Sequence, residues 1–232
     1  FAQMRQFSSD ASHELRTPLT VLQGQNELIL SKPRDPKEYQ EVMISNLEEI
    51  NYMSKVLEDL FAISKSDENQ ILLNCKPMDL SVLAEEVCKH AEVLAGDKDI
   101  AIIIAFLEPV KINGDEVRLR QMIWNILHNG IKYTQSGGEL KVSLLEEAGF
   151  ALLSIQDTGI GIPEKDLTSI FDRFYRVDKA RSRDEGGSGL GLSICKHIAE
   201  AHKGEIKVES KLGIGTRFKI RIPTTECEAI KQ

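Results

Sequence analysis

The first group of residues that could carry chemistry surrounds His13, near the start of the chain. His13 is followed by Glu14 and, one helical turn later, by Thr17. At about 100° per residue, His13 lies on the opposite face of a helix from Leu15, which begins an apolar stripe, so its imidazole is expected to be exposed. A neighbouring carboxylate and hydroxyl can orient an imidazole and exchange protons with it. The simpler alternative is a solvated surface histidine, but Pro18 counts against it, because a bend one turn later indicates a functional or packing requirement.

The second group is a pair of asparagines, Asn125 and Asn129, in the sequence NILHNGIKY. Residues four apart share one face of a helix, so the two amides point to the same side. Such a pair suits a magnesium ion, which keeps most of its water ligands and needs few protein ligands. The alternative is that both amides lie on the surface of a helix and bind only water.

The third group begins with Asp157, which ends an apolar run and is followed by the sequence TGIGI. A carboxylate at the end of a strand can accept a hydrogen bond from an exocyclic amine. The glycines after it would let a ring approach the backbone closely. A tight turn without any ligand is the alternative.

The remaining two patches are rich in glycine: residues 186–192 read GGSGLGL and residues 213–216 read GIGT. Successive backbone N–H groups at the start of a helix can bind an anion, and residues 186–192 open a predicted helix. Their spacing does not fit the dinucleotide-binding fingerprint, and no regular βαβ unit surrounds them. Each patch alone is weak evidence, but the asparagine, aspartate and two glycine patches in this order indicate a nucleotide site.

The composition limits the classes of function. The chain has 232 residues, 29 Lys plus Arg and 36 Asp plus Glu, which gives a net charge of -7. This balance disfavours binding to nucleic acid or to an anionic membrane surface. Its cysteines show no C-x-x-C pairing, which fits a reducing compartment and no zinc site. We read the following residues as packing or surface residues because they do not converge on one point: Cys195, His197 and His202.

The elements that position His13 form the first domain, which we place at residues 1–66. Residues 1–30 predict one long helix, closed by the breakers at 31–36, and residues 37–63 predict a second. The apolar stripe of the second helix is broader than one partner helix can cover. This favours two hairpins that dimerise into a four-helix bundle, although the hairpin could instead pack on the rest of its own chain. The stripe comprises Tyr39, Val42, Met43, Leu47, Ile50, Met53, Val56, Leu57, Leu60 and Phe61.

The polar residues 64–70 mark the boundary to a second domain, placed at residues 67–225, with a tail at 226–232. Its pattern predicts an α+β sandwich, one sheet under a helical layer. The expected strands are residues 71–75, 100–106, 139–146, 151–157, 204–210 and 216–222, and the expected helices are residues 80–95, 116–133, 164–170 and 190–201.

Taken together, the motifs resemble those of the cytoplasmic core of a sensor histidine kinase of two-component signalling, over nearly the whole chain. The sequence HELRTP from His13 resembles the H box of the dimerisation and phosphoacceptor domain. The other resemblances are residues 125–133 to the N box, 157–161 to the first glycine box, 171–174 to the F box and 187–191 to the second glycine box. The fold that this resemblance implies is an all-α helical hairpin, a four-helix bundle on dimerisation, followed by an α+β sandwich of the GHKL ATPase type.

The resemblance also implies the ligands, ATP and Mg²⁺. Asp157 would bind the adenine amino group, Tyr133 would lie against the ring, Asn129 would hold Mg²⁺ and Lys132 would lie near the phosphates. Gly130 is a departure, because the family usually carries Ala there; Gly weakens a helix by about 1 kcal/mol without abolishing binding. The further ATP-binding residues that the resemblance implies are Asn125, Gly159, Gly161, Ile162, Gly187, Ser188, Gly189, Leu190, Gly191 and Thr216.

Residues 176–186 would then form a mobile lid over the nucleotide. Arg176, Arg181 and Arg183 could contact phosphate there, and a solvated charged loop is an equally good interpretation.

The implied function is an ATP-dependent autokinase that phosphorylates its own His13 and passes the phosphoryl group to an aspartate of a response regulator. Glu14 would accept a hydrogen bond from Nδ1 of His13, and Thr17 would support a phosphatase activity towards the regulator. The expected partners are a second copy of the chain and the receiver domain of the regulator. We expect a membrane link only through upstream segments, since the chain starts without Met and has no apolar run long enough to span a bilayer. It would be the cytoplasmic portion of an inner- or plasma-membrane sensor.

Two other functions remain in competition. Related ATPases of type II topoisomerases and heat-shock chaperones activate water with a Glu one turn before the magnesium Asn; here that position is Asn125, which cannot take a proton at neutral pH. The other alternative is an inactive scaffold, and intact His13, Asn129 and Asp157 argue against it.

Overall fold

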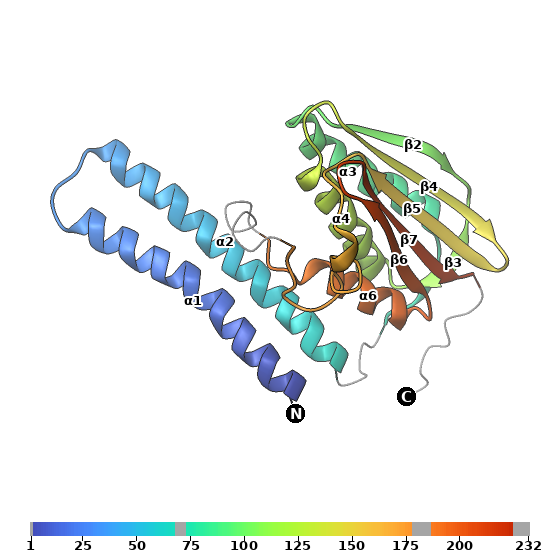
Figure 1. Ribbon diagram of the computed structural model, residues 1–232, viewed down its shortest axis with the longest axis horizontal. Coiled ribbons are helices and arrows are strands. Elements are labelled where there is room, and N and C mark those ends of the chain that lie inside the picture. Colours follow the sequence, from blue (N-terminus) through green and yellow to red (C-terminus); the bar gives the residue numbers. More distant parts are fainter. Residues whose placement is uncertain (1, 68–72, 178–186, 225–232) are drawn as a thin grey trace.

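Residues 2–67, 73–177 and 187–224 are described by a computed structural model (Figure 1). The N-terminal part is a hairpin of two long helices, α1 (Ala2–Leu30) and α2 (Pro36–Asp67), and Pro18 lies inside α1 without ending it. Asp35 caps α2: its carboxylate accepts from Lys37 N at 3.1 Å, while Glu38 accepts from Asp35 N at 3.1 Å. This reciprocal capping box and the Pro at the first helical position explain why α2 begins at Pro36.

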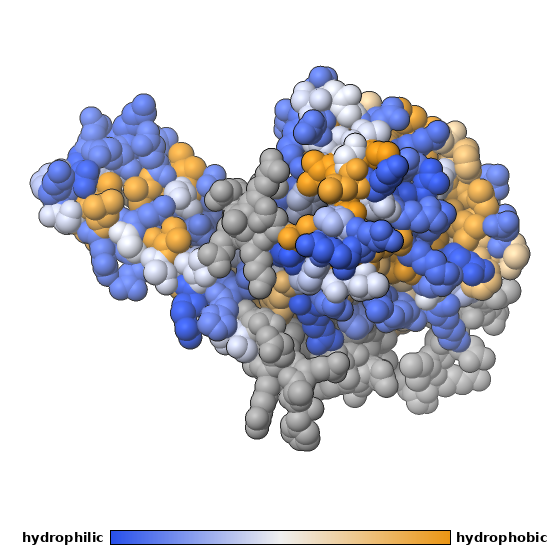
Figure 2. Space-filling view, in the orientation of Figure 1, coloured by the Kyte–Doolittle hydropathy of each residue, from blue (hydrophilic) through white to orange (hydrophobic). Residues whose placement is uncertain are grey.

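The hairpin leaves a broad apolar surface exposed. Only part of the apolar stripe on each helix is covered: Ile29 and Val56 are buried, and Val56 lies on the side of α2 that faces the sandwich. Figure 2 shows hydrophobic residues between the charged ones along this part of the molecule. The large apolar side chains that stay exposed on the two helices include Leu19, Leu28, Met43, Ile44, Leu47, Ile50, Leu57 and Phe61.

The C-terminal part is a two-layer sandwich with a five-stranded mixed sheet in the order β2-β4-β5-β7-β6. Only the pair β2 and β4 is parallel; the other neighbours are antiparallel. The strands are β2 (Ala101–Leu107), β4 (Glu139–Glu147), β5 (Phe150–Asp157), β6 (Glu205–Lys211) and β7 (Gly215–Pro223). The helices on one face are α3 (Leu80–Gly96), α4 (Glu116–Tyr133) and α6 (Gly191–Ala201). The predicted hairpin-plus-sandwich fold is therefore confirmed.

The core lies between this helical layer and the sheet. Alternate residues of β5 face it, since Ala151, Leu153 and Ile155 are buried while their neighbours are partly exposed. Two of the helices that cover it, α3 and α4, begin at aspartate caps: Asp79 accepts from Ser81 N and Asp115 accepts from Arg118 N. Each cap satisfies one of the N–H groups that the first turn of a helix leaves unpaired.

Two expected elements were wrong. A strand was expected at residues 71–75, but residues 73–75 have no regular structure and 71–72 lie outside the described residues. Instead β1 (Lys76–Asp79) pairs with β3 (Lys111–Gly114), which the sequence reading missed. Pro77 argued against a strand there, yet a strand with β3 as its one partner among the described strands tolerates a missing donor. The helix expected at 164–170 is only a 3₁₀ turn, Glu164–Asp166.

Gly130 sets how closely α4 approaches the sheet. A Cβ atom placed on Gly130 would come within 2.6 Å of Cδ2 of Leu140, a fully buried residue of β4. The space that an alanine methyl group would occupy is thus already filled by Leu140. The glycine allows this close contact at a cost in helix propensity of about 1 kcal/mol.

The two parts of the chain are in contact, because α6 packs against α2 (Figure 1). Among the described residues, no helix combines the length and apolar character needed to cross a bilayer.

Candidate functional site

A cavity of about 490 Å³ lies where the two parts meet. Four segments supply much of its wall: the C-terminal half of α4, the turn after β5, the glycine-rich segment that precedes α6, and one face of α2. Residues such as Arg176 and Thr216 complete it. Three of these segments carry the motifs that the sequence singled out. The fourth, α2, was assigned only to the hairpin core.

Asp157 forms one end of this cavity. Its side chain is only 8% exposed, and its Oδ1 accepts two backbone hydrogen bonds, from Gly159 N at 2.9 Å and Thr216 N at 3.0 Å. Burial raises the pKa of Asp157, and these two hydrogen bonds oppose the shift. Because both donors bind Oδ1, Oδ2 remains available for a donor on a ligand.

The α4 wall carries the two predicted amides and the two residues after them. Asn125 Nδ2 donates to Gly191 O at 3.4 Å, a long contact that ties α4 to the start of α6. The Asn129 side chain makes no hydrogen bond within the described part of the chain, although it lines the cavity. Lys132 Nζ lies 5.2 Å from the centroid of the Tyr133 ring. Asn129 and Lys132 thus present an amide and a cation to the same space.

The glycine-rich segment forms another part of the cavity wall. Gly189 has a φ of +71°, and a Cβ there would meet the backbone of Phe174 at 2.8 Å, so this turn requires glycine. A Cβ on Gly187 would lie 3.1 Å from Lys132 Nζ, which places the loop next to the lysine ammonium. Leu190 N donates to Ser188 Oγ at 3.3 Å at the start of α6. This arrangement brings backbone N–H groups and a cation together, as an anion site requires.

Most of the predicted ATP-binding residues line this one cavity. The exceptions are Gly159, which instead donates to Asp157, and Leu190, which is fully buried. Arg181 and Arg183, the other two predicted lid residues, lie outside the described residues. The predicted residues on the cavity wall are Asn125, Asn129, Lys132, Tyr133, Asp157, Gly161, Ile162, Arg176, Gly187, Ser188, Gly189, Gly191 and Thr216.

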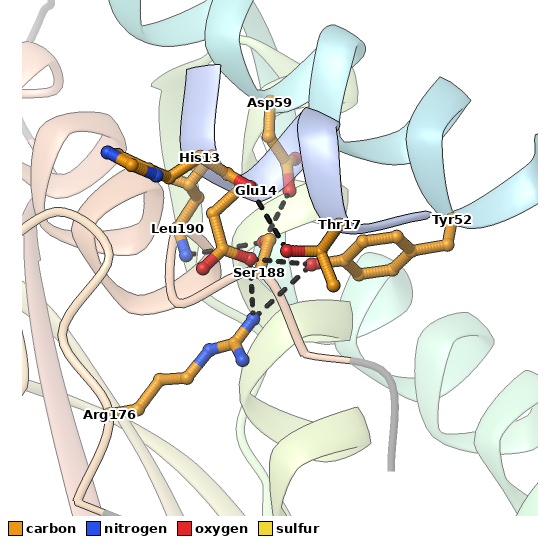
Figure 3. Close-up of polar contacts among 8 residues, drawn as sticks. All are labelled: His13, Glu14, Thr17, Tyr52, Asp59, Arg176, Ser188 and Leu190. Carbon is orange, nitrogen blue, oxygen red and sulfur yellow. Dashed lines mark hydrogen bonds and ion pairs between the residues drawn. The ribbon is translucent and has the colours of Figure 1, made fainter. Parts of the chain in front are cut away.

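His13, Glu14 and Thr17 lie outside this cavity wall, on α1 (Figure 3). His13 is exposed, and its ring points away from the Glu14 carboxylate. Thr17 Oγ1 donates to His13 O at 3.3 Å, the hydrogen bond to the preceding turn that a structural role would use.

The Glu14 carboxylate forms hydrogen bonds with Tyr52 and Arg176 instead of with His13. Its Oε2 accepts from Tyr52 Oη at 2.9 Å and from Arg176 Nη2 at 3.1 Å. Arg176 also donates to Tyr52 Oη at 3.3 Å, so the three side chains form a closed triangle. Because Arg176 belongs to the sandwich, this triangle joins the two parts of the chain.

The sequence reading missed the residues that α2 contributes to the cavity: Tyr52, Lys55, Val56 and Asp59. Asp59 is 6% exposed, accepts a hydrogen bond from Ser188 Oγ at 3.3 Å, and has its pKa raised by burial. The available signal was a carboxylate next to Leu60 on the apolar side of an otherwise amphipathic helix. Its partner, Ser188, lies too far along the chain for any pattern to connect the two.

The cysteines and histidines near the end of α6 have packing roles, as expected. His202 is buried, with Nε2 accepting from Asp115 N at 3.0 Å and Nδ1 bonded to Ile198 O at 2.8 Å. Cys195 is buried and donates to Met122 O. Cys227 lies outside the described residues.

The donor set of the cavity fits a magnesium–nucleotide complex. Among the described residues there is no cluster of three or more His, Cys, Asp or Glu side chains that could hold a metal ion by themselves. A metal in this cavity would therefore rest on few protein atoms, such as the Asn129 amide, with other ligands from phosphate and water.

Two family models match the chain. Residues 3–69 match the His Kinase A (phospho-acceptor) domain, and residues 114–226 match the Histidine kinase-, DNA gyrase B-, and HSP90-like ATPase. Together the two models span most of the sequence.

Similar proteins agree with these matches. The chain is 39% identical over 229 residues to the probable sensor kinase SilS of Salmonella typhimurium, which covers 97% of this chain and 46% of the relative. The structure resembles the histidine kinase AdeS of Acinetobacter baumannii, with a TM-score of 0.75 at 27% identity over 92% of this chain and 98% of that one. It also resembles full-length ShkA solved with AMPPNP, with a TM-score of 0.71 at 26% identity over 96% of this chain and 47% of that one. The chain spans about half the length of the curated relatives that it matches.

Proposed function

Because the chain belongs to the histidine kinase family, we propose that it binds ATP with Mg²⁺ and transfers the γ-phosphoryl group to its own His13. The observation that carries this proposal is the cavity itself. Its wall contains three kinds of group. They are the buried carboxylate of Asp157, whose Oδ2 accepts neither of the two backbone hydrogen bonds, the amide of Asn129 with the ammonium of Lys132 on α4, and the glycine-rich segment at the start of α6. These groups match, in order, an adenine amine, a magnesium ion and a chain of phosphates.

Within this cavity, Asp157 Oδ2 would accept from the adenine amine, and Tyr133 would lie against the ring. Asn129 would hold Mg²⁺, which shields the charge of the phosphates, and Lys132 with the N–H groups of residues 187–191 would bind the phosphates. The structure of ShkA with AMPPNP, an ATP analogue, supports a nucleotide in a related fold.

In the proposed reaction, Nε2 of neutral His13 attacks the γ-phosphorus of ATP. An N–P bond forms as the bond from the γ-phosphorus to the β,γ-bridging oxygen breaks, and ADP leaves with that electron pair. The imidazole becomes cationic, and Glu14 would stabilise this charge by accepting a hydrogen bond from Nδ1. His13 lies outside the cavity wall, so the attack requires either a movement of the two domains relative to one another or the approach of His13 from a second copy of the chain.

A water-activating ATPase is a weaker candidate. The position where such enzymes would need a carboxylate base holds Asn125, and its amide donates to Gly191 O. An amide cannot take a proton from water at neutral pH.

The decisive experiment is incubation of the full chain with γ-labelled ATP and Mg²⁺. We expect label that is stable in base and labile in acid, and none in His13→Ala, which should still bind AMPPNP as the wild type does. Release of free phosphate without label on the chain would indicate the water-activating ATPase. Neither label nor release would indicate a scaffold.

Three finer points belong to the same proposal. The phosphoryl group would pass from His13 to an aspartate of a response regulator, and Thr17 would help the chain to remove it again. The chain would act as a homodimer, which is supported by the apolar side chains that α1 and α2 leave exposed. It would be the cytoplasmic portion of a membrane sensor, supported by relatives about twice its length that are named sensor kinases.

A further inference from the structure

We propose that the phosphoacceptor hairpin is an internal competitor of the nucleotide: through Glu14, Tyr52 and Asp59 it occupies Arg176 and Ser188, two groups on the cavity wall that a triphosphate would use. This inference rests on the proposed function and deepens it, because it assigns to the hairpin a role in setting nucleotide affinity. Figure 3 shows the residues involved.

The first contact is the triangle of Glu14, Tyr52 and Arg176. The Arg176 side chain is only 9% exposed and lines the cavity, and its Nη2 makes two of the three hydrogen bonds of the triangle. Its Nε is buried and has no hydrogen-bond partner among the described residues. A guanidinium binds best when its parallel N–H groups are matched by two oxygens, as in phosphate, so the hairpin satisfies Arg176 only in part.

Tyr52 holds this triangle together. Its hydroxyl donates to Glu14 and accepts from Arg176, so it links the anion and the cation as well as contacting both. Burial and, to a smaller degree, the charge of Glu14 raise the pKa of Tyr52 to about 12. The hydroxyl therefore stays protonated at neutral pH. Removal of the hydroxyl alone would delete the hydrogen bond from Arg176 to Tyr52 without changing the charge of any side chain.

The second contact is independent of the first. Ser188, in the glycine-rich segment, donates to the buried carboxylate of Asp59 at 3.3 Å. A phosphate that binds this segment would need the same hydroxyl or the space beside it, and it would face the negative charge of Asp59 at short range in a partly buried site. Asp59 therefore opposes phosphate both by occupying a donor and by repulsion.

Both contacts come from the hairpin, and both would have to change when phosphate occupies this end of the cavity. By linkage, a hairpin contact that weakens nucleotide binding must itself be weakened by nucleotide to the same degree. Nucleotide would thus release the sandwich from the hairpin and free Glu14 at the same time. His13 and Glu14 could then meet the γ-phosphate together.

The experiment measures the affinity of the full chain for AMPPNP with Mg²⁺ by calorimetry, so that phosphorylation plays no part. Tyr52→Phe should bind about 3- to 10-fold more tightly than the wild type, the change expected when the one hydrogen bond from Tyr52 to the sandwich is lost from the competing state. Asp59→Ala should also bind more tightly. The matched controls are Tyr39→Phe on the same helix, away from the cavity, and Glu58→Ala, an exposed carboxylate beside Asp59; both should bind as the wild type does.

A double-mutant comparison makes the test specific. In an Arg176→Gln background, Tyr52→Phe should no longer change the affinity, whereas Asp59→Ala should still increase it. Unchanged or weaker binding by Tyr52→Phe and Asp59→Ala, in chains whose thermal unfolding remains cooperative, would overturn the inference and leave the proposed function intact. If the folded wild type binds no AMPPNP at all, the proposed function fails, and this inference fails with it.

Discussion

The backbone N–H of Thr216 donates to Oδ1 of Asp157 at 3.0 Å, although 59 residues separate them in sequence. The contact exists because β5 and β7 are antiparallel neighbours, so the residues at the end of β5 and the start of β7 meet at one edge of the sheet. Gly159 N supplies the second bond to the same oxygen from the turn after β5. The carboxylate is thus held by two backbone donors, and no side chain among the described residues forms a hydrogen bond with it.

This relationship predicts the effect of Asp157→Asn. The Oδ1 of asparagine can still accept both backbone bonds, so the fold should survive, but an NH₂ group would replace Oδ2 and face the adenine amine. Two donors that face each other should weaken AMPPNP binding by about 10- to 100-fold, corresponding to roughly 1–3 kcal/mol. Calorimetry checks the affinity, and thermal unfolding within a few degrees of the wild type checks the fold. If the folded variant binds AMPPNP with wild-type affinity, Asp157 does not contact the nucleotide.

The role of Thr17 can be tested against a threonine on the same helix. Thr17 and Thr20 are both exposed, and each donates to the carbonyl four residues earlier, at 3.3 Å and 2.9 Å. If Thr17 positions water at a regulator's aspartyl phosphate, Thr17→Ala should slow loss of regulator phosphate at least several-fold and keep autophosphorylation. Thr20→Ala should leave both rates unchanged. Equal losses of every activity in Thr17→Ala would indicate a structural role in helix α1 around Pro18.

The proposed dimer predicts a difference between two exposed apolar side chains. Leu47 on α2 is 58% exposed and Val93 on α3 is 75% exposed, but only Leu47 belongs to the long apolar face of the hairpin. A charge at a buried dimer contact is costly, so Leu47→Asp should shift the full chain towards the monomer in sedimentation at micromolar concentration. Val93→Asp should sediment as the wild type does. A wild-type chain that is monomeric at that concentration would contradict the dimer.

His202 predicts part of the pH dependence of stability. Burial lowers its pKa below the ordinary value of 6.5, against weaker opposing effects of the Ile198 carbonyl and Asp115. Between pH 6.5 and the lower pKa of the folded chain, His202 is protonated in the unfolded chain but remains neutral in the folded chain. The contribution of His202 to the free energy of unfolding is therefore complete above pH 6.5 and is lost as the pH falls. His202→Gln should reduce the free energy of unfolding by about 1–3 kcal/mol at pH 7.5.

The measurement that checks this is the free energy of unfolding by urea at pH 7.5 and pH 5. The difference between the wild type and His202→Gln should become smaller at pH 5. Other groups with shifted pKa values, such as His128, are present in both proteins and cancel in the comparison. A difference that grows towards low pH would mean that His202 is charged in the folded chain.

Residues whose position depends on local sequence were predictable. The end of β5 at Asp157 followed from alternation and a glycine turn, and the common face of Asn125 and Asn129 followed from helical spacing. The failures have a physical cause as well. Strand β1 is short, contains Pro77 and is stabilised by β3 more than thirty residues later, so its own residues carry little signal.

The hairpin's part of the cavity could not be predicted for a similar reason. Tyr52 and Asp59 lie on a helix whose apolar stripe explains most of its sequence, and their partners come from the other domain. Arg176 was expected as a phosphate contact, but its bond to Glu14 joins residues 162 positions apart. Such contacts depend on how two separately folded parts meet, and periodicity within either part contains no information about that.

The contact between Gly130 and Leu140 has a consequence for nucleotide length. Gly130 follows Asn129 directly and lies beside Asp157, since a Cβ placed on it would come within 3.7 Å of Cβ of Asp157. The spacing between the proposed adenine contact on β5 and the magnesium and phosphate contacts on α4 therefore depends on a point where the α4 backbone lies directly against the Leu140 side chain of β4. A larger residue there would have to displace either the end of the Leu140 side chain or α4 itself, and a displaced α4 would lengthen the distance that the ligand must span. The close approach of α4 to the sheet at Gly130 thus helps to set the distance between the two parts of the proposed nucleotide site.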